Sequence, residues 1–162
     1  MINLYQKKMP IVASTPEELD TDEWYENWPN FSPFELASDG QGPVGGDGSV
    51  RAWFLVLGQL QNLRSAFGGP LTITSAYRDP AYNAAIGGSP RSYHVEGSAY
   101  DISCRDTAMM RRLAHIAIEH DRLFPVEGFR LAEVGWYPRR HFIHLAWNVP
   151  GRNKPLTQWS EE

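Results

Sequence analysis

Three side chains of this sequence are candidates to hold a metal ion: His94, Asp101 and His144. The first two are seven positions apart, and the small residues Gly97 and Ala99 between them let the chain turn and pass close beneath an ion. Imidazole nitrogen and carboxylate oxygen both bind zinc at about 2.0–2.2 Å. A lone histidine on an apolar face is more often a satisfied core residue, but His144 in the apolar run FIHLAW would be costly without a partner. Taken together, the three residues predict one bound Zn²⁺.

Two nitrogens and one carboxylate leave the fourth position of a tetrahedral zinc open, which is the catalytic arrangement and not the structural one. Such a site also needs a group that moves protons and a cation that binds a carboxylate or stabilises an oxyanion. His141, three residues before His144, and Arg78, after a predicted strand, are the candidates. The ordinary alternative for Arg78 is a surface ion pair of little energetic value.

The composition excludes several other classes of protein. A chain of 162 residues with 42% hydrophobic and 21% charged residues fits one globular domain. Its net charge of -4 gives no general attraction for phosphate backbones, so we expect no nucleic-acid partner. Cys104 is the single cysteine, which excludes disulfides within the chain and a thiolate cluster. No apolar run approaches the roughly 20 residues that span a bilayer, and the N-terminus lacks the apolar segment of a signal peptide.

Separate helical and strand patterns must position the candidate residues. Apolar residues recur at helical spacing from Trp53 to Phe67, and Gly68, Gly69 and Pro70 end the pattern. We expect helices over 53–67, 80–84 and 106–120, and strands over 71–77, 98–103, 129–134 and 142–147. The last two strands are predicted antiparallel neighbours joined through 135–140. The result is an α+β fold, with helices packed on a small antiparallel sheet.

Residues 1–30 are rich in Pro, Glu and Asp and lack periodicity, which predicts an extended N-terminal arm ahead of a globular domain over 31–162. Trp24, Tyr25 and Trp28 give this arm aromatic anchors. Two alternatives stay open for them: the aromatic side chains fold back on the domain, or they dock on a partner.

A family resemblance enters with the segment SYHVEGSAYD, 92–101. It resembles the S-x-H-x-x-G-x-A-x-D signature of the zinc DD-carboxypeptidase and hedgehog-type metallopeptidase family. Four further segments are similar to this family, and the resemblance covers about residues 30–159: SAYRDPAYN (75–83), IGG (86–88), FIH (142–144) and NFSPFEL (30–36).

The resemblance implies a hedgehog/DD-peptidase-like fold and a role for each matching residue. His94, Asp101 and His144 would be the zinc ligands, Arg78 would bind a substrate carboxylate or the developing oxyanion, and His141 occupies the place of the general base. We add Ser92 and Tyr137 as candidate substrate-binding residues.

Two positions depart from the family pattern. The third-ligand strand usually reads H-x-D, whereas this chain has Ala146 in place of the aspartate, so we expect the carboxylate that would orient His144 to be missing. The base position is more often Asp or Glu than His141.

By resemblance, the expected function is hydrolysis of a peptide bond in the peptidoglycan stem peptide, as a D-Ala-D-Ala carboxypeptidase or an L-Ala-D-Glu endopeptidase. A phage lysin of this build passes from the host cytoplasm to the periplasm through a holin, or is carried on the phage particle. The alternative is a virion structural component that retains the peptidase fold and attaches to phage proteins through residues 1–30. A third reading is a hedgehog-like binding module without catalysis.

Overall fold

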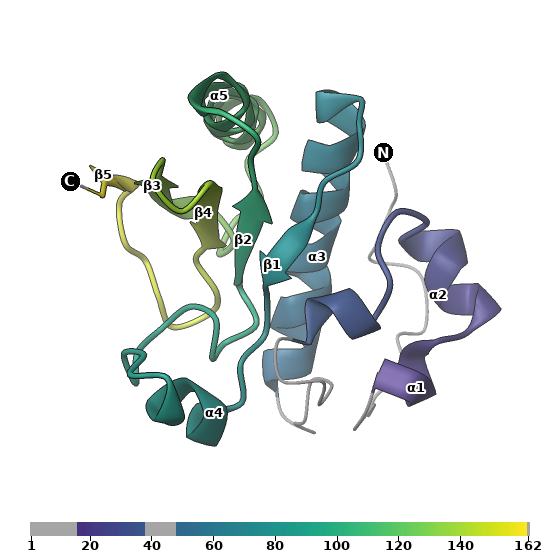
Figure 1. Cartoon of the computed structure of the whole chain (residues 1–162). Coiled ribbons are helices and arrows are strands. Elements are labelled where there is room, and N and C mark those ends of the chain that lie inside the picture. The colour runs from purple at the N-terminus through teal and green to yellow at the C-terminus, as the bar shows by residue number, and fades with distance from the viewer. Residues whose placement is uncertain (1–15, 38–47, 162) are drawn as a thin grey trace.

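A five-stranded sheet with helices on one face forms the centre of the protein (Figure 1). The computed structural model describes residues 16–37 and 48–161, so residues 1–15 of the predicted arm lie outside the described residues. Its helices are α1 Pro16–Leu19, α2 Asp22–Asn27, the 3₁₀ helix η1 Phe34–Leu36, α3 Gly48–Phe67, α4 Pro80–Ala85 and α5 Thr107–Leu123. Its strands are β1 Ile73–Ser75, β2 Ala99–Ser103, β3 Leu131–Tyr137, β4 Phe142–Trp147 and β5 Thr157–Ser160.

The strands follow the order β1-β2-β4-β3-β5. The first four pair antiparallel, and β3 and β4 are antiparallel neighbours as predicted. Their connection is 138–141 and not the predicted 135–140, because β3 continues to Tyr137. The predicted α+β class is confirmed, but β5 pairs parallel to β3, so the sheet is mixed and not antiparallel throughout. We did not predict β5 because TQWS is too short and too polar to show an alternating pattern.

Alternation along the strands separates the core from the site. On β4, Ile143, Leu145 and Trp147 belong to the main core cluster, whereas the side chain of His144 points to the opposite face. The core cluster also takes buried residues from both long helices and from β2: Val56, Leu57, Leu60, Leu63, Met110, Leu113, Ala114, Ala117, Tyr100 and Ile102. The helices α3 and α5 therefore cover one face of the sheet, and the opposite face carries the candidate site.

The described part of the N-terminal segment is helical where we predicted an extended chain. Thr21 caps α2 by accepting a hydrogen bond from the backbone of Trp24, which explains why so short a helix forms there. Leu19, Trp24 and Trp28 are buried in the main core cluster, and Figure 1 shows α1 and α2 beside α3, away from the sheet. In residues 16–30, then, the two tryptophans fold back on the domain. The domain boundary at residue 30 stays a prediction.

Among the described residues, no helix combines the length and the apolar character that crossing a membrane requires.

Candidate metal centre

One row of residues crosses all five strands and forms the centre of the site. Asp101 pairs with Ser75 on one side and with His144 on the other. Gly135 pairs in the same way with His144 and with Trp159. The register of the sheet therefore brings together residues that are far apart in the sequence.

The remaining candidate ligand, His94, comes from the loop before β2. Ser92 Oγ accepts a hydrogen bond from the backbone N–H of His94, and the carbonyl of His94 accepts from Gly97 and from Arg78. Gly97 has φ +67°, a left-handed conformation that other residues adopt at a cost. The glycine of the signature is thus required for the turn that returns the chain from His94 into β2.

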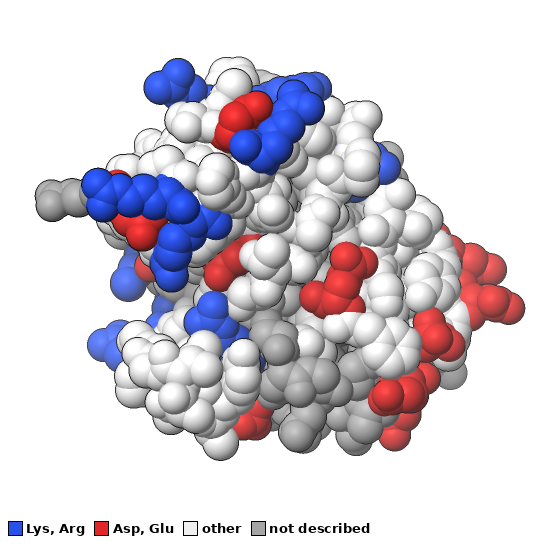
Figure 2. Space-filling view, in the orientation of Figure 1, with Lys and Arg blue, Asp and Glu red and all other residues white. Residues whose placement is uncertain are grey.

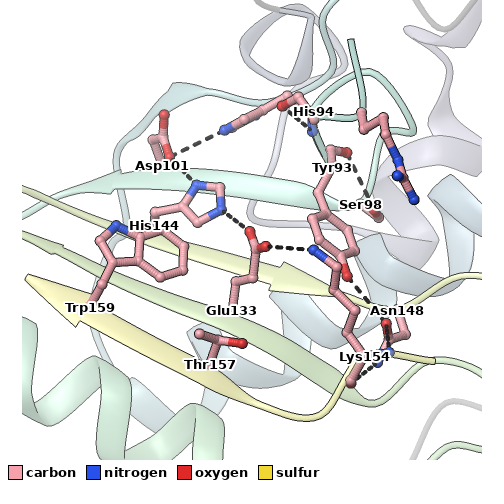
Figure 3. Close-up of polar contacts among 12 residues, drawn as sticks. Tyr93, His94, Ser98, Asp101, Glu133, His144, Asn148, Lys154, Thr157 and Trp159 are labelled. Carbon is pink, nitrogen blue, oxygen red and sulfur yellow. Dashed lines mark hydrogen bonds and ion pairs between the residues drawn. The ribbon is translucent and has the colours of Figure 1, made fainter. Parts of the chain in front are cut away.

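Both candidate histidines contact the same carboxylate oxygen of Asp101 (Figure 3). Oδ1 of Asp101 lies 3.3 Å from Nε2 of His94 and 2.8 Å from Nδ1 of His144. The three ligand atoms lie within 4.8 Å of one another, and the residues are 3%, 7% and 9% exposed in sequence order. Buried charged groups are rare unless they are paired or bind a metal, so this cluster is a candidate metal centre.

The second ring nitrogen of each histidine has its own acceptor. Nδ1 of His94 lies 2.7 Å from the carbonyl of Ala76, and Nε2 of His144 lies 3.3 Å from Oε2 of Glu133. When both rings donate to these acceptors, Nε2 of His94 and Nδ1 of His144 are the nitrogens left to bind a metal ion beside Asp101. Metal-binding histidines in proteins have this arrangement, so the donor set fits Zn²⁺.

Burial and hydrogen bonding shift the pKa values of all three groups. Burial lowers the pKa of His94 below its usual value, against the opposing effect of Asp101. Burial alone would lower the pKa of His144, but its hydrogen bonds with Asp101 and Glu133 raise it above the usual value. Burial alone would raise the pKa of Asp101, but its hydrogen bonds with His144 and His94 lower it. An ionised Asp101 and a neutral His94 are the forms that bind metal, and a protonated His144 would release its proton on binding.

The cluster lies in a cleft of about 850 Å³ that also contains the predicted Arg78, Ser92 and Tyr137. Arg78 donates from Nε to Ser75 Oγ at 2.9 Å and from Nη2 to Asp101 Oδ2 at 3.3 Å. Its guanidinium therefore holds the carboxylate oxygen that faces away from the histidines. Tyr137 stacks on Phe142 at the edge of the cleft, with ring centroids 4.3 Å apart.

His141 is placed differently from the other candidates. It is exposed, lies in the turn before β4 with φ +56°, and does not line the cleft that the described residues form. Its backbone carbonyl accepts a hydrogen bond from Cys104 at 2.7 Å. The structure brings Arg78, Ser92 and Tyr137 to the metal cluster, but not the side chain of His141.

Among the cleft residues that sequence reasoning missed are Glu133, Lys154 and Trp159. Oε2 of Glu133 lies 3.3 Å from Nε2 of His144, the ring for which the alanine at 146 led us to expect no carboxylate neighbour. The sequence feature that could have indicated Glu133 is a carboxylate inside the largely apolar stretch FRLAEVG. Trp159 lies beside His144, with ring centroids 5.7 Å apart, in a segment without any pattern.

The comparison with protein families agrees with this geometry. The sequence profile of the family described as Peptidase M15 matches residues 29–146, which include all three candidate ligands. No curated protein matches the chain. A match over most of the chain and a mixed five-stranded α+β sheet lead to the same conclusion: the chain belongs to the M15 peptidase family, a family of hydrolases.

Proposed function

We propose that the protein is a zinc-dependent peptidase that hydrolyses a peptide bond in the stem peptide of peptidoglycan. The cluster of His94, Asp101 and His144 on the floor of a cleft carries this proposal. Membership of the M15 family supports both the hydrolase chemistry and a substrate of the peptidoglycan type.

The chain's own residues prepare the cleft for this reaction. When bound, zinc supplies the Lewis acidity that activates water and polarises a peptide carbonyl. Ser75 holds the guanidinium of Arg78 through Nε, so that its remaining N–H groups face the cleft next to the metal cluster. A fixed guanidinium at this position suits a substrate carboxylate or the negative charge that develops on the carbonyl oxygen.

The charge of the cleft favours an anionic peptide. Among the residues that the structure describes, the cations Arg78, Arg91, Arg140 and Lys154 line it, and its carboxylates, Asp101 and Glu133, each contact a candidate histidine ligand. Figure 2 shows many acidic residues on the right of the view, over the N-terminal helices, in a chain whose net charge is -4. The cations of the cleft suit a substrate with more than one carboxylate, as a stem peptide has.

Both stem-peptide cleavages remain within the proposal. A D-Ala-D-Ala carboxypeptidase would place the terminal carboxylate on Arg78, and an L-Ala-D-Glu endopeptidase would place a glutamate carboxylate there. The same proposal includes a role as a phage lysin, which the family resemblance supports.

Mass spectrometry of purified peptidoglycan after incubation with the zinc-loaded protein tests the function. Release of D-alanine indicates the carboxypeptidase, and new D-glutamate amino termini indicate the endopeptidase. A chelated sample and the His144→Ala variant are the controls. Intact stem peptides after incubation with protein that carries stoichiometric zinc would contradict the proposed peptidase.

A further inference from the structure

A second row of paired residues runs beside the metal row. Ala146 on β4 pairs with Ala99 on β2 and with Glu133 on β3, and Glu133 pairs with Thr157 on β5. The two alanines are fully buried and have side chains too small to reach any ligand. In this row, Glu133 therefore supplies the carboxylate next to the metal cluster.

The side chain of Glu133 reaches diagonally across the sheet to His144 (Figure 3). Oε2 lies 3.3 Å from Nε2 of His144, and Oε1 lies 3.9 Å from Nζ of Lys154. Diagonal neighbours on one face of a sheet are within the reach of long side chains. Glu133 is thus fixed between an imidazole N–H and an ammonium group.

The position of Lys154 is itself fixed by the chain. Asn148 accepts a hydrogen bond from the backbone N–H of Lys154 at 3.1 Å and donates one to its carbonyl at 2.9 Å. The hydroxyl of Tyr93, next to His94, donates to the same asparagine at 3.3 Å. A chain of polar contacts therefore runs from the loop of His94 to Glu133.

We propose that Glu133 is a positioning residue that replaces, from the neighbouring strand, the carboxylate that the H-x-D pattern places two residues after the third ligand. This inference rests on the proposed zinc function. Positions 133 and 146 are paired on adjacent strands, so a carboxylate at either one can approach Nε2 of His144. Carboxylates at both positions would repel each other, which accounts for alanine at 146. Glu133 acts through His144: it fixes the ring and its tautomer, so that Nδ1 binds the metal.

Zinc affinity, measured by competition with a chromogenic chelator, tests this role without reference to turnover. We expect Glu133→Ala to weaken zinc binding by about 10–100-fold, the range seen when a group that orients a metal ligand is lost. Glu133→Ala combined with Ala146→Asp should restore most of the affinity. Glu96→Ala is the matched control, because Glu96 is a partly buried carboxylate paired with Arg152 at 2.9 Å and does not line the cleft.

Nitrogen-15 NMR of the histidine rings gives a second measurement. The metal-free wild type should show a proton on Nε2 of His144, and Glu133→Gln, which keeps the shape of the side chain, should alter that resonance. Wild-type affinity in Glu133→Ala, or a loss that Ala146→Asp does not restore, overturns the role of Glu133 and leaves the zinc site intact. Failure of the wild-type protein to bind zinc through its three ligands would overturn the proposed function as well.

Discussion

Asp101 and His144 are paired residues of adjacent antiparallel strands, and Oδ1 of the aspartate lies 2.8 Å from Nδ1 of the histidine. The separation of these two ligands is therefore set by backbone hydrogen bonds of the sheet and not by flexible loops. Only His94 reaches the site from a loop, and the turn at Gly97 ties that loop to β2. A site built on paired strands is held more rigidly than one built on loops.

The first prediction is that the protein binds one zinc per chain through these three residues. We expect His94→Ala, Asp101→Ala and His144→Ala each to lose stoichiometric zinc, because a site with two remaining ligands binds weakly. Metal analysis of the purified variants measures this. His115→Ala, on the exposed side of α5, is the matched histidine control. Full zinc occupancy in either histidine variant would show that the ligand assignment is wrong.

The second prediction concerns Arg78. Removal of its guanidinium should lower kcat/KM by about 10²–10³-fold while zinc stays bound, because the charge faces the reacting groups. Arg78→Lys should recover little, since an ammonium cannot hold Ser75 and Asp101 in the same two directions. Arg105→Ala, which removes an exposed ion pair with Asp106, is the control and should keep full activity. Equal activity of Arg78→Ala and wild type would show that Arg78 acts only as an ion-pair partner of Asp101.

The third prediction concerns Gly135, which pairs with Trp159 and lies against its ring. A Cβ atom at this position would lie 2.6 Å from the Trp159 ring, so Gly135→Ala should destabilise the protein by about 1–3 kcal/mol. Thermal and denaturant unfolding measure the change. Gly69→Ala, whose Cβ would meet Phe67 at an ordinary 3.4 Å, is the control.

A double-mutant cycle distinguishes strain against the Trp159 ring from other effects of replacing glycine at position 135. If the Trp159 ring causes the strain, Gly135→Ala should cost much less in a Trp159→Ala background. An equal cost in both backgrounds would mean that the ring does not lie on Gly135.

The fourth prediction uses the single thiol. Burial raises the pKa of Cys104 to about 11, so almost none of it is thiolate at pH 8, and thiolate is the reactive form. Because the raised pKa belongs to the folded state, stability is unaffected below the pKa of the unfolded thiol. It falls as the pH rises from there toward 11, where only the unfolded chain ionises. Labelling with a disulfide reagent at pH 8 should be slow in native protein and fast in denaturant. Rapid native labelling would contradict the burial.

The part of the candidate site that the sequence could predict is the part encoded within single segments. The signature 92–101 contains two candidate ligands and the turn between them, and the strand pattern around His144 is local too. Glu133 and Trp159 reach the site through the pairing of neighbouring strands, and linear spacing does not show which residues pair. The helix α2 was missed because six residues are too few for a helical period to show.

His141 is a candidate general base because it stands three positions before His144, and this role stays a prediction. The structure places it in the exposed turn before β4, at φ +56°, away from the residues that line the cleft. Its backbone carbonyl accepts a hydrogen bond from the backbone N–H of Cys104.

The last prediction tests whether His141 acts as the general base or only as a residue of the turn before β4. As a general base it would contribute about 10²–10⁴-fold to the rate, and His141→Ala would lose that factor with zinc still bound. From its position in the turn we expect His141→Ala to keep activity within a few-fold of wild type. We also expect His141→Gly to be at least as stable as wild type, because glycine adopts a positive φ without strain. Initial rates on stem peptides and thermal unfolding of both variants measure the two effects. A hundred-fold loss of rate in His141→Ala, with full zinc occupancy and unchanged stability, would restore His141 as the base and require the turn to bring its imidazole into the cleft when substrate binds.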